Sequence, residues 1–247
     1  MFIILLSIQV IFSCKAIEKL PQSTVVYEKK ATNTPNSQDS ITIIATELYE
    51  GGMIKHAFQG RGYHKAWETP ITVSKVRLDT LYGGLTPVKK GSGNQTQSLE
   101  LHDNKGNGYT LRSVNKDPRS LVPDFARKIG IAGIVTDGIS AQHPYGALVV
   151  PSMADRIGLW HSTPRLVYLE HQLALDSFNY DFENRVYFLE YETEGTGEWT
   201  NLERIIEVTT TEGIQKLDAG HDYFEIDTAN LIRARLFNLM IGDWGLG

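Results

Sequence analysis

The sequence has one cysteine, few prolines and no excess of positive charge. Cys14 stands alone among 247 residues, which excludes an internal disulfide. The chain has 24 Lys and Arg residues and 29 Asp and Glu residues, so its net charge is −5. A chain with this charge is a poor candidate for binding the phosphate backbone of a nucleic acid. We therefore expect no nucleic acid among its partners. With 22 Gly, 9 Pro and 41% hydrophobic residues, the composition also excludes a collagen-like or mostly disordered chain.

Several motifs that carry chemistry are also missing. The seven histidines show no His-Glu-x-x-His spacing, so the sequence predicts no metal site. There is no Gly-x-Ser-x-Gly for a serine hydrolase, and a lone cysteine near the N-terminus does not suit a cysteine nucleophile. No Gly-Lys-Ser/Thr follows the glycines at 91 and 93, which excludes a Walker loop. The sequence therefore lacks the common motifs of serine hydrolases, cysteine hydrolases and P-loop nucleoside triphosphatases.

The N-terminus predicts export and a lipid anchor. Residues 1–13 are almost wholly apolar but too few to cross about 30 Å of hydrocarbon as a helix, which is typical of a signal-peptide core. The following block, Ile11-Phe12-Ser13-Cys14, resembles the lipobox of bacterial lipoproteins, although no Lys or Arg precedes the apolar run. The resemblance implies acylation of Cys14, membrane attachment, and a place in the periplasm or at the outer membrane. The alternative is an incidental cysteine in a cleaved signal peptide.

The remaining chain predicts an α+β protein with two lobes. Residues 14–40, with the proposed anchor at Cys14, are polar and contain Pro and Ser, which favours a flexible tether. Residues 41–120 are β-rich, and residues 121–247 are mainly helical. Because the sequence stops directly after its most apolar helix, we expect the helical lobe to be incomplete at its C-terminus.

Individual elements follow from periodicity and turn signals. Residues 96–103 and 108–115 flank Asn104-Lys105-Gly106-Asn107, which predicts a β-hairpin with Arg112 on its polar face. Asp227 or Thr228 is expected to cap the start of the last helix. Apolar residues cover most of the circumference of this helix, so we expect the helix to be buried. The other expected strands are 41–49, 71–79, 165–169 and 185–191, and the other expected helices are 123–142, 145–158 and 199–208.

The segment from Lys89 to Thr96 is the candidate binding loop. Its glycines, Gly91 and Gly93, allow backbone N–H groups to turn inward around phosphate oxygens, but the same loop can be an ordinary turn into the hairpin. Arg112 would project beneath this loop and meet a phosphate, or form a cross-strand pair with Glu100. The sequence leaves both alternatives open.

Five blocks carry a resemblance to a known family. GGLTPVKKGSGNQTQSLEL, YTLRSVNKDP, ISAQHPYGALVVPSMADRIG, LWHSTPRLVYL and RARLFNLMIGDW resemble a family of exported Gram-negative proteins of largely uncharacterised function, over about residues 49–244. The family's last block is similar to the catalytic loop of atypical kinases of the spore-coat, toxin–antitoxin and Golgi secretory types. The resemblance implies a kinase-like fold, with ATP and Mg as cofactors.

The resemblance also implies roles for individual residues. Nucleotide-binding residues would be Gly91, Gly93, Asn94, Gln95, Thr96 and Arg112, with Lys116 as a substitute for Arg112 and Asp137 as its acidic partner on the first helix. Where the family has the second Asp of Asp-Trp-Asp, this chain has Gly245, followed by Leu246-Gly247 in place of Arg-His. Asp243 remains as a candidate catalytic residue.

Three functions are consistent with these features. The first is an exported, lipid-anchored, kinase-like protein without its catalytic groups. The second is an active ATP-dependent phosphotransferase in full-length form. The third is a non-enzymatic cell-envelope module that binds an envelope protein or glycan, in which the glycine loop is only a turn.

Overall fold

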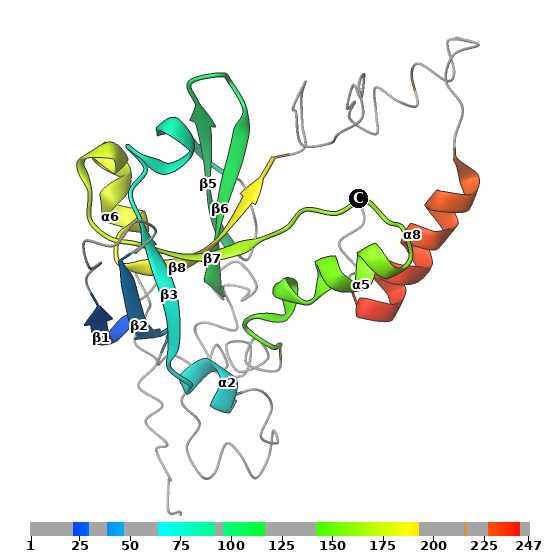
Figure 1. Ribbon diagram of the computed structural model, residues 1–247, viewed down its shortest axis with the longest axis horizontal. Helices are drawn as coiled ribbons and strands as arrows, with labels where there is room; N and C mark the ends of the chain where they lie inside the picture. Colours follow the sequence, from blue (N-terminus) through cyan, green and yellow to red (C-terminus); the bar gives the residue numbers. More distant parts are fainter. Residues whose placement is uncertain are drawn as a thin grey trace, which may run out of the picture.

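The computed structural model describes residues 22–29, 39–46, 64–91, 96–116, 142–192, 215 and 227–242. They contain eight strands and several short helices (Figure 1). The strands are β1 (Thr24–Lys29), β2 (Ser40–Ile44), β3 (Ile71–Val76), β4 (Leu85–Lys90), β5 (Thr96–Asp103), β6 (Gly108–Lys116), β7 (Arg165–Leu169) and β8 (Arg185–Tyr191). The α-helices are α2 (His64–Glu68), α5 (Val150–Arg156), α6 (Asn179–Phe182) and α8 (Thr228–Ile241), and the 3-10 helices are η1 (Leu81–Gly83), η3 (Gly146–Leu148) and η4 (Leu173–Phe178).

All eight strands belong to one sheet in the order β1-β2-β3-β7-β8-β6-β5-β4. Neighbouring strands are antiparallel except β3 and β7, which are parallel. The β5–β6 hairpin is confirmed, with Leu99 opposite Leu111 and Leu101 opposite Tyr109. The expected strands at 165–169 and 185–191 are confirmed as β7 and β8. The described residues therefore form a mixed α and β structure around one mostly antiparallel sheet.

The described residues do not confirm the expected separation into a β-rich lobe and a following helical lobe. β7 and β8 come from the half expected to be helical, yet they lie at the centre of the sheet, between β3 and β6. Central strands hydrogen-bond on both sides, so these two strands connect the halves of the sheet. Two helices were expected at 123–142 and 199–208, and nearly all of their residues lie outside the described part of the chain. The helix expected over 145–158 is present as η3 and α5.

Two further expectations are corrected by the structure. Residues 24–29, expected within a flexible tether, form the edge strand β1, because a run of Val, Val and Tyr fits a pleated surface. Helix α8 begins at the expected cap, where the Asp227 carboxylate accepts the N–H of Asn230 at 3.0 Å. However, α8 is not buried, since Phe237 is its only buried residue. Its exposed apolar residues are Leu231, Ile232, Leu236, Leu239 and Met240.

The core consists of two clusters on opposite faces of the sheet. Val167 and Tyr168 are consecutive but belong to different clusters, as do Phe188 and Leu189, because alternate strand residues point to opposite faces. On the first face, η4 and α6 contribute Leu175 and Phe182 to the larger cluster. On the second face, the smaller cluster around β2, β3 and β7 is covered by Trp67 from α2, which is 1% exposed.

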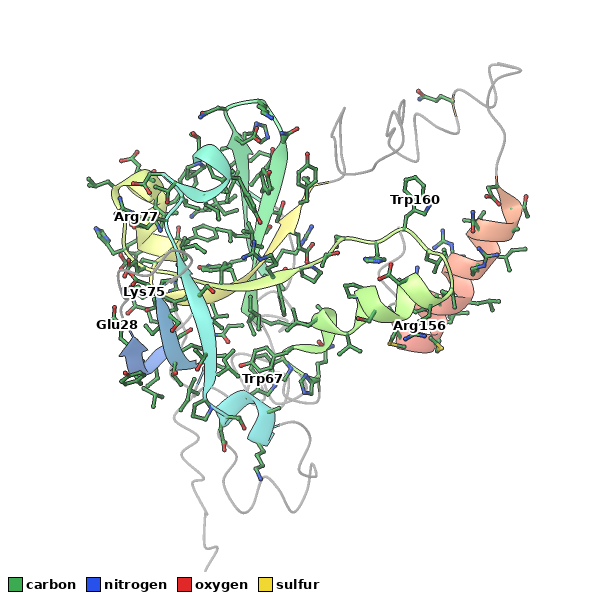
Figure 2. The ribbon with its side chains drawn as sticks, viewed as in Figure 1. Glu28, Trp67, Lys75, Arg77, Arg156 and Trp160 are labelled. Atoms are coloured by element: carbon green, nitrogen blue, oxygen red, sulfur yellow. The ribbon has the colours of Figure 1, made fainter. Side chains whose placement is uncertain are left out.

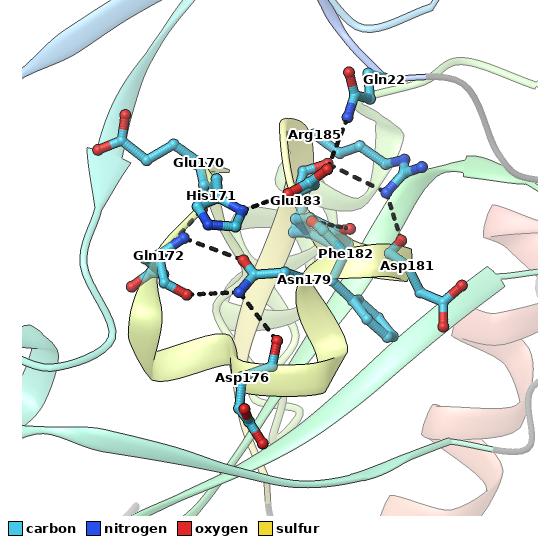
Figure 3. A network of polar contacts seen from close by, with 11 residues as sticks. Gln22, Glu170, His171, Gln172, Asp176, Asn179, Asp181, Phe182, Glu183 and Arg185 are labelled. Carbon is cyan, nitrogen blue, oxygen red and sulfur yellow. Dashed lines mark hydrogen bonds and ion pairs between the residues drawn. The ribbon is translucent and has the colours of Figure 1, made fainter.

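Polar contacts hold η4 and α6 against the sheet (Figure 3). The Gln172 carboxamide accepts the N–H of Leu78 at 2.7 Å, and the Asn179 carboxamide donates to the Gln172 carbonyl at 2.8 Å. Arg185 is 1% exposed, and its guanidinium donates to the carbonyl of Glu183 at 3.2 Å and to that of Asp181. The bonds from Arg185 satisfy carbonyls at the end of α6, where no helical partner is available.

Candidate functional site

Polar side chains gather on the second face of the sheet, over β4, β5, β6 and β8. Strand register places Lys89 opposite Glu100, Glu100 opposite Thr110, and Thr110 opposite Glu190. Directly opposite residues point to the same face, so these four side chains form one row across four strands. Arg112 and Glu192 follow two residues after Thr110 and Glu190 on the same face. We call Lys89, Glu100, Thr110, Arg112, Glu190 and Glu192 the polar patch.

Arg112 is the cation near the centre of the polar patch. It is the only exposed residue of β6, with a side chain 46% exposed, and its Nε lies 3.5 Å from Oε2 of Glu190. The expected position on the polar face is therefore confirmed. The partner is Glu190 on β8 and not Glu100, which instead lies 3.1 Å from Nζ of Lys89 and 3.3 Å from Nε2 of His102.

Glu190 and Glu192 give the patch an acidic edge. Burial raises the pKa of the Glu190 carboxyl above 4.5; the positive charge and hydrogen bond of Arg112 oppose this effect, and the charge of Glu192 adds to it. Both oxygens of Glu192 accept from the Thr110 hydroxyl, at 2.9 and 3.0 Å. The patch thus holds three carboxylates and two cations, and Glu190 is the group in it whose ionised form is disfavoured by the fold.

Gly91, the first residue after β4, lies beside this patch. Gly91 donates its N–H to the carbonyl of Ser98 at 2.9 Å, and Ser98 lies opposite Arg112 in the register. A Cβ at position 91 would lie 1.9 Å from the Ser98 hydroxyl, so the close approach of these two strands requires glycine. The structure therefore brings Gly91 and Arg112 to the two sides of Ser98. Lys89 and Lys90, expected in the loop, belong to β4.

Lys116, the predicted substitute for Arg112, lies apart from it. It lies at the far end of β6, four residues or about 13 Å along the strand, opposite Thr96. Its ammonium group donates to the Gln142 carboxamide, and burial lowers its pKa. The two basic residues of β6 therefore lie near opposite ends of the glycine loop, Arg112 near Gly91 and Lys116 near Thr96.

Several predicted site residues are outside the described part of the chain: Gly93, Asn94, Gln95, Asp137, Asp243 and Cys14. Within the described part, no group of three or more His, Cys, Asp or Glu side chains is arranged to hold a metal ion. In the same residues, no helix has the length and apolarity needed to cross a membrane.

Sequence reasoning missed Ser98, Glu190 and Glu192 as parts of the site. Alternation within 185–191 was enough to place Glu190 on the face opposite Leu189. What it could not show is that β8 is the neighbour of β6, because these strands are separated by about 70 residues and their pairing depends on the whole sheet.

Comparisons with protein-family models, with curated proteins and with solved structures find no match to this chain.

Proposed function

We propose that this chain is an exported, lipid-anchored cell-envelope protein whose sheet binds a magnesium nucleotide in a kinase-like manner without transferring its phosphate. One observation supports it above the others: Gly91, directly after β4, and Arg112 on β6 occupy the positions on the two sides of Ser98. A glycine connection between two strands, followed by a strand with a basic side chain, is the order expected from the kinase resemblance.

The chemistry of the polar patch suits a phosphate with a bound cation. An arginine guanidinium offers several N–H donors in a planar fork that matches phosphate oxygens. Glu190 and Glu192 would repel a free polyphosphate, so we expect the nucleotide to bind with Mg²⁺, which offsets part of its charge. On binding, phosphate would replace Glu190 as the partner of Arg112.

The absence of transfer is proposed from the last block of the resemblance. In kinases an Asp of the catalytic loop accepts the proton of the acceptor hydroxyl. This chain has Gly245 where the family has that Asp, and a glycine offers no proton acceptor. We therefore expect nucleotide binding without turnover.

Calorimetric titration of the full chain with Mg–ATP tests the proposal. We expect saturable binding that Arg112→Ala abolishes and that Arg165→Ala leaves unchanged, since Arg165 is exposed on β7 and donates to the Tyr82 hydroxyl at 2.9 Å, away from the patch. Release of ADP over hours would favour an active phosphotransferase. No binding by the folded protein would contradict the nucleotide site.

A second candidate function is a binding or assembly module without nucleotide. The observation that favours it is the ion pair between Arg112 and Glu190, because a guanidinium already paired within the sheet needs no ligand. In this case the Gly91 N–H serves only the hairpin, where it already donates to Ser98.

The lipid anchor has its own test. We expect Cys14→Ser to release the protein from the membrane fraction, because acylation requires the thiol. The measurement is the partition of the full chain between membrane and soluble fractions, with Ser13→Ala as the control, since alanine keeps a small residue before the cysteine. Retention of Cys14→Ser in the membrane would contradict the anchor.

A further inference from the structure

Tyr82 has a backbone conformation that is unusual for its residue type. It lies in η1, in the turn between β3 and β4 and beside the β5–β6 hairpin (Figure 2), and its φ is 52°. Gly83 and Gly84 follow it with φ values of 84° and 109°. In this left-handed region a Cβ crowds the main chain, so a bulky side chain costs free energy that a third glycine would avoid. Backbone strain of this kind is concentrated at functional sites, so the Tyr82 ring is a candidate binding group.

The Tyr82 ring lies flat on an aromatic part of the core. Its centroid is 4.9 Å from that of the Tyr109 ring, with an angle of 13° between the two rings, and the Tyr109 and Tyr191 rings meet edge to face. Tyr109 is buried, whereas Tyr82 is 44% exposed. Because stacking covers only one face of a ring, the exposed area of Tyr82 belongs mainly to its outer face and its edge. The turn therefore presents a flat aromatic surface to solvent.

Hydrogen bonds hold this surface in one orientation. Arg165 on β7 donates from Nη1 to the Tyr82 hydroxyl at 2.9 Å. The turn is fixed at Gly83, whose carbonyl accepts a hydrogen bond from the Asn104 carboxamide at 3.0 Å. A ring that is already oriented loses little conformational freedom when a ligand binds to it, which favours association.

The chemistry around the outer face of Tyr82 matches a saccharide. The face of an aromatic ring is electron-rich and attracts weakly positive C–H groups. A pyranose with equatorial hydroxyls has axial C–H groups on its faces and hydroxyls around its edge. Arg165 is exposed, and its guanidinium has several N–H donors in a planar fork, which can bind adjacent hydroxyls of such a sugar.

Two other ligands that stack on aromatic rings fit this surface less well. A quaternary ammonium binds best within a cage of several ring faces, but Tyr82 offers one outer face beside the positive charge of Arg165. A single nucleic acid strand binds along a positively charged groove, and this chain has a net charge of −5. The neighbouring groups therefore favour an uncharged ligand with several hydroxyls.

We propose that the outer face of Tyr82 binds a pyranose ring of a saccharide by stacking, while Arg165 donates hydrogen bonds to the hydroxyls of that ring. Tyr109, beneath Tyr82, belongs to the first face of the sheet, whereas the polar patch lies on the second face. The inference is therefore independent of the proposed nucleotide site. One ring face and one guanidinium make a small contact, so we expect a dissociation constant of about a millimolar.

Saturation-transfer difference NMR on the full chain measures this binding, with the β-1,4-linked trisaccharides of glucose and of N-acetylglucosamine as probes. In the wild type we expect saturation to reach the axial C–H protons of one sugar ring most strongly. Tyr82→Asn should abolish the signal, because asparagine tolerates a positive φ but has no ring. The matched control is Tyr180→Asn, which should leave binding unchanged, since Tyr180 is 66% exposed but lies on α6.

Two further variants test the site without removing the ring. Tyr82→Phe should keep the signal, and Arg165→Ala should weaken saccharide binding at least about threefold. Binding of Mg–ATP should be the same in Tyr82→Asn as in the wild type, so failure of this proposal is distinguishable from failure of the nucleotide site. No saturation of either trisaccharide by the wild type, equal loss in Tyr82→Asn and Tyr180→Asn, or saturation of added uridine but of neither sugar would overturn the proposal.

Discussion

At the scale of single residues, two charged side chains are held in the sheet by different means. The guanidinium of Arg185 is nearly inaccessible and donates to main-chain carbonyls around α6. The Glu190 carboxylate has the cation Arg112 beside it, yet its pKa is raised because burial outweighs that attraction. A buried cation surrounded by acceptors stabilises the fold, whereas a half-buried carboxylate with a single cation at 3.5 Å costs free energy when ionised.

The Glu190→Gln variant should become more stable than the wild type as pH rises. The folded-state pKa of Glu190 lies above 4.5, so its stabilising contribution is complete below pH 4.5 and is lost as pH rises through the folded-state pKa. Glutamine does not ionise, so the free energy of unfolding of the variant should rise relative to wild type across this interval. Urea unfolding at a series of pH values measures the difference. A difference that does not change with pH would contradict the expectation.

If the nucleotide proposal is right, Glu190→Gln should also bind Mg–ATP more tightly, by about tenfold or ~1.4 kcal/mol, because phosphate no longer competes with a carboxylate for Arg112.

Arg185→Lys should destabilise the protein by about 1–3 kcal/mol. Both bonds come from Nη1 at the end of the guanidinium, and the shorter lysine side chain does not bring its ammonium group to the same point, so a buried acceptor loses its partner. Urea unfolding gives the free energy of unfolding. Arg165→Lys is the matched control, because Arg165 is an exposed residue of the neighbouring strand, and it should change stability by less than about 0.5 kcal/mol. Equal effects of both variants would contradict this role of Arg185.

At the scale of elements, the β4–β5 connection is shaped by one close contact. Gly91 approaches Ser98 so closely that its missing side chain is a packing requirement, whatever the loop binds. The glycine therefore has two separable roles, one in the hairpin and one proposed for phosphate.

Gly91→Ala should destabilise the hairpin by about 1–3 kcal/mol, and Ser98→Ala should relieve part of that cost. The added Cβ would lie 1.9 Å from the Ser98 hydroxyl, which alanine removes, and 3.2 Å from the Ser98 Cβ, which it keeps. A double-mutant cycle on the free energy of unfolding should give a coupling of at least about 0.5 kcal/mol. Strict additivity would show that the two side chains do not meet.

At the scale of the whole molecule, β1 is joined to the rest of the sheet by a partly buried cation as well as by its pairing with β2. Nζ of Lys75 lies 2.7 Å from Glu28 on β1 and 2.7 Å from Glu170 after β7, and its side chain is 11% exposed. Burial alone would lower the pKa of Lys75, but hydrogen bonds and charges from Glu170 and Glu28 together raise it. Three separate segments of the chain therefore meet at one ammonium group.

Lys75→Met should loosen β1 and leave the β5–β6 hairpin intact. Without the ammonium, Glu28 and Glu170 repel each other at the same place, so amides of residues 24–29 should exchange faster. Hydrogen exchange read by mass spectrometry measures this segment by segment. Lys89→Met is the control, since Lys89 pairs with Glu100 at the opposite edge. A uniform change in all strands would contradict a local role.

Local signals in the sequence were sufficient for some elements. The hairpin of β5 and β6 was predicted because its strands alternate and a glycine turn separates them by four residues. β7 and β8 were predicted within their observed limits from short runs of residues typical of strands. Asp227 was one of two predicted caps, and it caps α8. These features depend only on residues close together in the chain.

The sequence by itself determined the segments that form β5, β6, β7 and β8, that Arg112 lies on a polar face, and that a glycine follows β4. Tertiary structure alone decided that β1 joins the sheet, that β7 and β8 lie at its centre, and that Glu190 is the partner of Arg112. It also left α8 exposed although the helix is apolar. The physical reason is that alternation and turn chemistry act over a few residues, whereas strand order and burial depend on which distant segments compete for the same edge or face.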